Sequence, residues 1–422
     1  MKFQRHVLQN GVRLLTVPMK DTSTVTVLVL VETGSKYETK NLAGVSHFLE
    51  HMCFKGTEKR PNAHVLSTEL DSIGAEYNAF TSQEYTGYYA KAHSKHAETL
   101  LDVVSDLYQH QRFDPEEIQR EKGVIIEEIN MYEDMPQQSV HELLFETLYS
   151  NQPAGWSIAG TKETVMSMTR DNFIAYTNAH YVAGATVVVI AGAYDESTVV
   201  SSVEKAFVGL RTTPKQDKPA VIDNQKESIV ALKHKKSDQT HLDLAMRAYS
   251  TYDERNYSLN VLAGILGRGM SSRLFQLLRE RMGVCYYVHA DVDTYTDHGI
   301  FQISAGIDTN RVEETIKALM TELRRLTTEL VSETELSKVK EYITGKMALS
   351  LESSDSWANY VGMQEVLKKN IKTPSELALR IQAVTANDVM DRAKELIRED
   401  NMTLAMVSPY SDKEALKKLL KL

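Results

Sequence analysis

The sequence predicts an α+β protein of two similar domains, each a mainly antiparallel β-sheet packed with α-helices. The chain has 422 residues, too many for one compact core but suited to two domains of about 200 residues. A polar stretch containing Pro214 and Pro219 lies near the midpoint, as expected of a linker. The order of strands and helices before this stretch recurs after it. The predicted boundaries are 1–212 for the first domain, 213–227 for the linker and 228–422 for the second domain.

In the first half, a β-branched, apolar run at residues 25–31 predicts a central strand. A helix follows and ends before Lys55. Two strand-like runs, 76–81 and 85–90, predict a hairpin, and Pro115 opens a long helix. The other elements expected in this half are strands at 12–17 and 186–190 and helices at 64–73, 94–111 and 196–207.

The second half repeats this order. Its helix at 257–266 carries Leu, Val, Ala and Ile where the first helix of the other half carries histidines and a glutamate. This pattern indicates a duplication in which one copy is chemically active. The expected strands are 229–233, 240–248, 284–293, 299–306 and 402–407, and the other expected helices are 272–282, 311–327, 333–350, 374–397 and 412–421.

The main chemical motif is His47-Phe48-Leu49-Glu50-His51. On a helix, His47 and His51 lie ~40° apart around the axis and one turn apart along it, so their imidazoles share a face, as at many zinc sites. Glu50 lies ~60° to the other side of His47, near the pair without being forced into the ligand set. Zinc-dependent hydrolysis uses this arrangement, because the ion acidifies a water and the carboxylate accepts its proton. The order H-x-x-E-H inverts the commoner H-E-x-x-H metalloprotease signature.

The alternative is a surface helix that happens to carry two histidines and a glutamate. Apolar residues surround the polar triplet on nearly every side, among them Leu42, Val45, Phe48 and Met52. Buried histidines and glutamates need partners, so the pattern favours a metal site.

A third ligand is expected, because a catalytic zinc has three protein ligands and one open position. On the predicted helix after Pro115, Glu128 shares a stripe with Glu121 and aliphatic residues. Glu127 is rotated ~100° from Glu128. A carboxylate on an apolar stripe needs a positive partner, and Glu121 is suitably spaced to support a ligating histidine. Spacing alone leaves open the alternative that all these glutamates face water.

Composition and charge argue against a nucleic-acid-binding protein, a disulfide-stabilised protein and a membrane-spanning protein. The net charge of −9 gives no indication of nucleic-acid binding. The two cysteines, Cys53 and Cys285, are too few for a disulfide framework in this chain. Residues 1–6 lack an apolar signal core, and no apolar run approaches the ~20 residues of a membrane span. A cytoplasmic location is therefore expected.

With its glutamates, the motif resembles the pitrilysin family of zinc peptidases (inverzincins), closest to the mitochondrial processing peptidase branch and its bacterial relatives. Glu128 and Glu121 match that family's downstream glutamates. The resemblance implies one Zn²⁺ per chain, held by His47, His51 and Glu128, with Glu50 as the general base and Glu121 as a supporting catalytic residue.

The resemblance extends to the second half. The segment Arg279-Glu280-Arg281-Met282-Gly283-Val284-Cys285-Tyr286 is similar to one in which an Arg and a Tyr reach the substrate carbonyl. This implies that Arg279 and Tyr286 donate to a developing oxyanion. The residues alone fit an alternative equally well, in which Arg279 is an exposed helical residue and Tyr286 is a core strand residue. Many relatives have a glycine at the position of Arg268.

In the same family the first-half hairpin supplies an edge strand that pairs with extended substrate. This implies substrate binding by Asn78, Ala79, Phe80 and Thr81. The residues alone also fit an ordinary edge hairpin.

The resemblance implies a metalloendopeptidase in which the two domains face each other as a clamshell. It would cleave unfolded peptides or presequence-like segments in a closed chamber. A homodimer is expected because the chain carries both the zinc motif and the Arg/Tyr pair. The alternative is a heterodimer with a related subunit. No nucleic acid or membrane partner is expected. The alternative is a non-catalytic scaffold of the same fold, like the core subunits of respiratory complex III; such relatives typically lose parts of the zinc motif.

Overall fold

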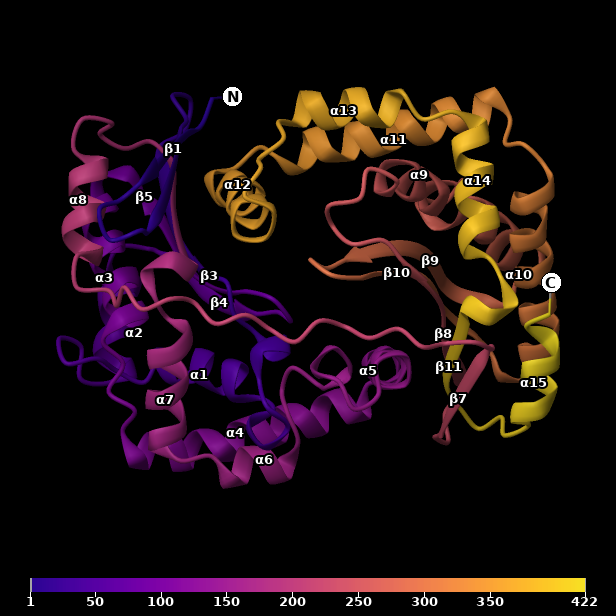
Figure 1. Ribbon diagram of the computed structural model, residues 1–422, viewed down its shortest axis with the longest axis horizontal. Coiled ribbons are helices and arrows are strands. Elements are labelled where there is room, and N and C mark those ends of the chain that lie inside the picture. Colours follow the sequence, from indigo (N-terminus) through magenta and orange to yellow (C-terminus); the bar gives the residue numbers. More distant parts are fainter. Residues whose placement is uncertain (1, 422) are drawn as a thin grey trace. The chain divides into compact units, whose positions relative to one another are not determined.

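The computed structural model describes residues 2–421, which form two compact units (Figure 1). The chain passes from unit 1 to unit 2 between Pro219 and Ala220, inside the predicted linker. Two segments depart from the predicted domain boundaries. Residues 131–156 of the first half belong to unit 2, and residues 350–371 of the second half belong to unit 1. Each unit thus contains one segment from the other half of the sequence.

Unit 1 contains a six-stranded sheet, sheet 1, with the spatial order β1-β2-β6-β3-β5-β4. Neighbouring strands are antiparallel except for β2 and β6, which are parallel. Strand β4 lies at an open edge, so its outer backbone groups are not used by the sheet. The strands are β1 (Gln4–Val7), β2 (Arg13–Pro18), β3 (Thr24–Val31), β4 (Glu76–Thr81), β5 (Thr86–His93) and β6 (Thr186–Gly192).

Unit 2 contains a five-stranded sheet, sheet 2, with the order β7-β11-β8-β10-β9. Numbered by their occurrence in each unit, with β1 left aside, the strands of both sheets follow the order first, fifth, second, fourth, third. In both sheets the first and fifth strands are parallel. This shared topology confirms the predicted pair of similar α+β halves. The strands are β7 (Ile229–His234), β8 (Gln239–Ala248), β9 (Cys285–Thr294), β10 (Gly299–Asp308) and β11 (Met402–Ser408).

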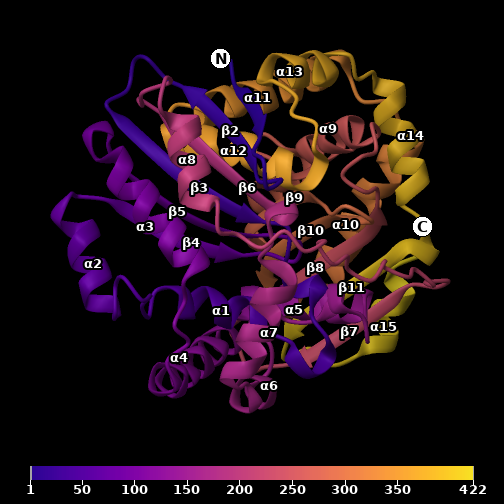
Figure 2. The same cartoon turned by 60° about the vertical axis from the view of Figure 1, so that its left-hand side comes forward.

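Alternation along β3 places sheet 1 between two apolar layers. Val25, Val27 and Val29 face the main core with α1 and α3. Leu28 and Leu30 face the opposite side, where they pack against α12. Helix α12 lies beside the strands of this sheet in Figure 2. The helices of unit 1 are α1 (Val45–Cys53), α2 (Ala63–Ser72), α3 (Ala97–Gln109), α4 (Pro115–Asp134, which continues into unit 2 at Met131), α6 (Lys162–Ser167), α7 (Arg170–His180), α8 (Val199–Phe207) and α12 (Ser354–Lys368).

Sheet 2 is covered in the corresponding way. Helix α9 packs on one face, and α5 packs beside β8 and β11 on the other (Figure 1). The predicted helix at 374–397 is two helices, because the side chain of Thr385 accepts a hydrogen bond from the Asp388 N–H and begins a new helix there. The helices of unit 2 are α5 (Pro136–Leu148), α9 (Asn256–Gly267), a π-helix (Phe275–Arg281), α10 (Val312–Thr328), α11 (Glu333–Ser350), α13 (Pro374–Gln382), α14 (Ala386–Leu396) and α15 (Lys413–Leu419).

None of the helices within residues 2–421 is both long enough and apolar enough to cross a membrane.

Candidate metal centre

Helix α1 begins at a backbone position that requires glycine. Gly44 has φ = +93°, and an added Cβ would lie 2.6 Å from the carbonyl oxygen of Ala159. The buried carboxylate of Glu38 accepts hydrogen bonds from the N–H groups of Gly44 (2.7 Å) and Ser46 (2.8 Å), so it satisfies donors that the first helical turn leaves open. Burial raises the pKa of Glu38 to about 7, although these bonds act in the opposite direction. The helix is thus anchored immediately before His47.

The structure brings together the three predicted ligands, His47 and His51 from α1 and Glu128 from α4. Oε2 of Glu128 lies 3.6 Å from Nε2 of His47 and 3.5 Å from Nε2 of His51. Among the described residues, these three form the one group of at least three His, Cys, Asp or Glu side chains whose ligand atoms all lie within 4.8 Å of one another. All three are partly buried.

These distances fit a zinc ion. Two ligand atoms about 2.1 Å from a tetrahedral zinc are separated by about 3.4 Å, close to the observed 3.5 and 3.6 Å. The donors are two imidazole nitrogens and one carboxylate oxygen, a set that catalytic zinc sites use. A divalent cation would also compensate the charge of a carboxylate held among buried groups. The residues present therefore fit the predicted metal.

The two histidines differ in their electrostatic environments. Burial, with a further contribution from His51, lowers the pKa of His47 to about 4. Burial alone would also lower the pKa of His51, but Glu121 and Glu128 outweigh it and raise this pKa to about 9. Glu121 lies behind His51, with Oε1 3.9 Å from Nδ1, while its Oε2 lies 2.6 Å from Nζ of Lys55. Glu121 thus lies beside His51, and its supporting role remains a prediction.

Glu50, the expected general base, lies on α1 between the two histidines in sequence. Its Oε2 accepts a 2.5 Å hydrogen bond from the hydroxyl of Thr81 at the end of β4. Burial raises the pKa of Glu50, while Thr81 and His51 act to lower it. Edge strand β4 is therefore hydrogen-bonded to the helix that carries His47 and His51.

The predicted substrate-binding residues Asn78, Ala79, Phe80 and Thr81 all lie on β4, at the open edge of sheet 1. Phe80 contacts the rings of Tyr85 and Tyr89 on the side of the sheet that α12 covers. The edge position is shown by the structure, and the substrate-binding role remains a prediction.

The backbone of Ala79 points toward the open edge. A hydrogen bond from the Ser82 N–H to the Tyr85 carbonyl (2.9 Å) closes the turn between β4 and β5. Antiparallel ladders alternate between hydrogen-bonded and non-hydrogen-bonded pairs, so Ala79, which lies opposite Tyr88, is in a non-hydrogen-bonded pair. Its N–H donates instead to Oδ1 of Asn78 at 2.9 Å.

Arg279 and Tyr286 lie in unit 2, Arg279 within the π-helix and Tyr286 on β9. The guanidinium of Arg279 donates to the Cys285 carbonyl (2.8 Å) and lies 5.5 Å from the centre of the Tyr286 ring. Tyr286 is 72% exposed, so the alternative of a core strand residue is wrong. The two side chains are neighbours, and their action on a substrate remains a prediction.

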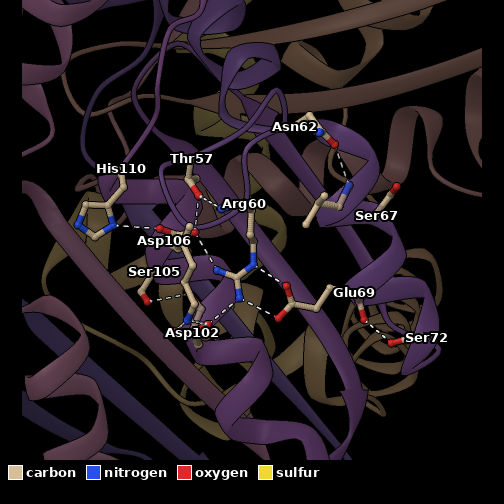
Figure 3. A network of polar contacts seen from close by, with 12 residues as sticks. Thr57, Arg60, Asn62, Ser67, Glu69, Ser72, Asp102, Ser105, Asp106 and His110 are labelled. Carbon is tan, nitrogen blue, oxygen red and sulfur yellow. Dashed lines mark hydrogen bonds and ion pairs between the residues drawn. The ribbon is translucent and has the colours of Figure 1, made fainter.

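An ion cluster around the buried Arg60 fixes the loop between α1 and α2 (Figure 3). The guanidinium of Arg60, which is 2% exposed, donates to Glu69 of α2 and to Asp102 and Asp106 of α3. The hydroxyl of Thr57 donates to the same oxygen of Asp106 at 2.6 Å. This cluster connects the end of the motif helix to two further helices.

Sequence reasoning missed three contacts of the site. Glu38 caps α1, Lys55 neutralises Glu121, and Thr81 donates to Glu50. Lys55 lies four residues after His51 in the sequence, a spacing that offered a signal. The other two depend on loops and strands that the sequence pattern does not place.

Comparison with protein families and known proteins agrees with this geometry. Residues 13–162 match the family described as "Insulinase (Peptidase family M16)", and residues 167–343 match "Peptidase M16 inactive domain". The chain is 37% identical over 406 residues to "Uncharacterized zinc protease YmxG" of Bacillus subtilis, covering 96% of this chain and 98% of that one.

The chain belongs to peptidase family M16. It is also 33% identical over 404 residues to an "Uncharacterized zinc protease" of Rickettsia felis, covering 95% and 96% of the two chains. These names and the His-His-Glu geometry together support a zinc protease.

Solved structures show the same fold at low sequence identity. A protease from Helicobacter pylori has a TM-score of 0.89 at 21% identity, covering 97% of this chain and 99% of that one. A structure described as a peptidase M16 inactive domain from Pseudomonas fluorescens has a TM-score of 0.90 at 17% identity, covering 97% of this chain and 99% of that one. A chain of complex III2 from Candida albicans has a TM-score of 0.85 at 16% identity, covering 99% of this chain and 100% of that one.

Proposed function

We propose that this M16 chain is a zinc-dependent endopeptidase that cleaves extended, unfolded peptides. The observation that supports this best is the position of Glu50. It lies on the helix that supplies His47 and His51, and it is hydrogen-bonded to Thr81 of an open edge strand. A peptide paired with that strand would lie beside a carboxylate and a cation site.

His47, His51 and Glu128 would hold the zinc. When bound, zinc supplies Lewis-acid chemistry that acidifies a water and polarises a carbonyl. Glu50 accepts the proton of the attacking water and delivers it to the leaving amine. The proton taken at the start of the reaction is thus returned at its end, and Glu50 regains its charge.

Strand β4 supplies the substrate specificity in this proposal. The outward N–H and C=O of Ala79 would pair with an extended backbone, the N–H leaving its local bond to Oδ1 of Asn78. Such pairing selects unfolded segments over folded domains. Arg279 and Tyr286 are proposed, from the family resemblance, to donate hydrogen bonds to the oxygen of the scissile carbonyl. The second unit then contributes to catalysis although it carries no second copy of the motif.

Hydrolysis of a quenched fluorescent peptide tests the proposal, with zinc content measured on every sample. We expect the wild type to cleave, and Glu50→Gln to retain its zinc but lose at least roughly 100-fold in kcat, the usual contribution of a general base. A folded protein containing the same peptide sequence should resist cleavage. Equal rates for wild type and Glu50→Gln would contradict the role of Glu50.

The alternative is a non-catalytic subunit. The similarity to a complex III2 chain shows the fold alone. The present chain retains the full motif, and its structure brings together all three ligand residues. If the wild type holds one zinc per chain and cleaves no peptide, the scaffold function replaces the peptidase function, or a related subunit is required. Mixing with candidate subunits separates these two outcomes.

We also propose that the chain acts as a homodimer, because it carries both the zinc motif and the Arg/Tyr pair. Sedimentation velocity at micromolar concentration tests this. A single species with twice the mass of the chain is expected, and a monomer with full activity would contradict it.

A further inference from the structure

The bond between Thr81 and Glu50 has a specific geometry. The hydroxyl of Thr81 donates to Oε2 of Glu50 at 2.5 Å, a short distance typical of a hydrogen bond to a charged carboxylate. A carboxylate has two oxygens, and this bond commits one of them. We infer that Thr81 is a positioning residue that fixes the rotation of the Glu50 carboxylate, so that Oε1 takes the proton of the attacking water. This rests on the proposed function and gives Thr81 a role beyond substrate pairing.

Thr81 is held in place on the sheet side by its strand. It ends β4, opposite Thr86 of β5. The turn that follows is closed by the bond from the Ser82 N–H to the Tyr85 carbonyl (2.9 Å). The backbone of Thr81 therefore lies between a strand ladder and a closed turn.

The same turn is fastened to the segment that precedes α1. The N–H of Ser35 donates to the Ser82 carbonyl at 3.2 Å, and the N–H of Lys36 donates to the Gln83 carbonyl at 2.9 Å. The backbones approach so closely that a Cβ on Gly34 would lie 2.1 Å from the Ser82 oxygen. Only glycine fits between the two segments.

A buried ion pair reinforces this junction. Nζ of Lys36 lies 3.0 Å from Oε1 of Glu84, and the two side chains are 1% and 2% exposed. Lys218 contacts the same carboxylate oxygen at 3.2 Å. Since the turn cannot move without breaking these buried contacts, the Thr81 hydroxyl is a fixed donor rather than a mobile surface group.

The consequence for catalysis is geometric. Without this donor the Glu50 carboxylate is free to rotate about its last side-chain bond, and neither oxygen is held toward the attacking water. In the bound arrangement, the proton moves from the water to Oε1 and then to the leaving amine, while Oε2 keeps its bond to Thr81. The expected effect of losing the hydroxyl is on the chemical step, not on peptide binding.

Four variants test this inference. Thr81→Val keeps the side-chain shape but removes the donor, and Thr81→Ser keeps the donor. The other two are Glu50→Gln alone and Glu50→Gln combined with Thr81→Val. Kinetics with a quenched fluorescent peptide, zinc content and thermal melting are measured for each. Thr81→Val should lower kcat by roughly 10- to 100-fold with KM changed less than about threefold and zinc retained. Thr81→Ser should restore most of the lost kcat. In the Glu50→Gln background, Thr81→Val should have little further effect, because both act on one step.

Several results would overturn the inference. These are an unchanged kcat in Thr81→Val, an equal loss in Thr81→Ser, or a rise in KM alone, which would assign Thr81 to peptide binding only. A full Thr81→Val effect in the Glu50→Gln background would also overturn it. If the wild type holds one zinc per chain but cleaves no peptide, the proposed function itself is contradicted, and this inference is contradicted with it.

Discussion

Lys55 and Glu121 form an ion pair directly behind the candidate metal centre, with Nζ 2.6 Å from Oε2. Glu121 is almost fully buried, and its other oxygen faces Nδ1 of His51 at 3.9 Å. Burial alone would raise the pKa of Glu121, but His51 and Lys55 lower it below its usual value. A charged carboxylate is therefore held behind one ligand. By contrast, Nδ1 of His47 is buried with no hydrogen-bond partner among residues 2–421.

Glu121→Gln should weaken zinc binding without abolishing it. The amide loses the charge that orients His51, and loss of such a supporting partner typically lowers metal affinity by about 10- to 100-fold. Competition against a chromophoric chelator measures this change. Glu127→Gln, an exposed position on the same helix, serves as the control and should bind zinc as the wild type does. Equal affinity in both variants would show that Glu121 has no supporting role.

Glu128→Gln should have a larger effect, because it removes a ligand oxygen's charge. We expect zinc content after gel filtration to fall well below one ion per chain, together with loss of peptide hydrolysis. Glu127→Gln is again the matched control, since it makes the same chemical change one residue away. Stoichiometric zinc in Glu128→Gln would exclude Glu128 from the ligand set.

The sequence predicted those parts of the site that depend on helical periodicity. His47, Glu50 and His51 lie on one short helix, and Glu128 lies on a second whose apolar stripe was readable, so the side chains' directions follow from residue spacing alone. The repeat of strand order was equally visible, because strands and linkers have local signals. The ligand set then required only that the two helices meet.

The contacts between distant segments were not predictable in this way. Thr81 was expected to bind substrate because its hairpin resembles that of the family, and nothing in the sequence around it shows that its hydroxyl meets Glu50. Helix α12 was missed because it packs on sheet 1 through a discontinuous set of small and apolar residues, Ala358, Val361 and Val366. Its assignment to unit 1 depends on tertiary packing, which overrides the boundary that the linker suggests.

Ala79→Pro tests whether substrate pairs with the open edge of β4. The Ala79 N–H makes no ladder bond to β5, so proline removes an outward-facing donor and its local bond to Oδ1 of Asn78, but no hydrogen bond of the sheet. We expect kcat/KM to fall by about tenfold, the equivalent of one hydrogen bond of about 1.4 kcal/mol, with zinc content unchanged.

Ala79→Ser is the matched control for this position, because it keeps the N–H and adds only one atom at a site that is 7% exposed. Retained zinc and an unchanged melting temperature in both variants would show that the fold is intact. If Ala79→Pro cleaves extended peptides as fast as Ala79→Ser does, then substrate does not use this backbone donor.

His180 gives unit 1 a predictable sensitivity to acid. It is the last residue of α7, is 7% exposed, and packs its ring against Tyr176 at 4.4 Å and Tyr37 at 5.9 Å between centroids. Burial lowers its pKa from 6.5 to about 4. The folded state therefore holds His180 neutral at pH values where the unfolded chain would be protonated.

The sign of the effect follows from this depressed pKa. The stabilisation is fully present above pH 6.5, the unfolded pKa, and is lost as the pH falls toward about 4, the folded pKa. Between pH 7.5 and pH 5 the wild type should lose about 2 kcal/mol of unfolding free energy through this residue. His180→Gln should have a lower unfolding free energy at pH 7.5, because it loses packing. Since glutamine cannot take up the proton, the variant should lose about 2 kcal/mol less than the wild type between pH 7.5 and pH 5. Urea unfolding at the two pH values measures the difference, and identical pH dependence in both proteins would show that His180 does not control the acid response.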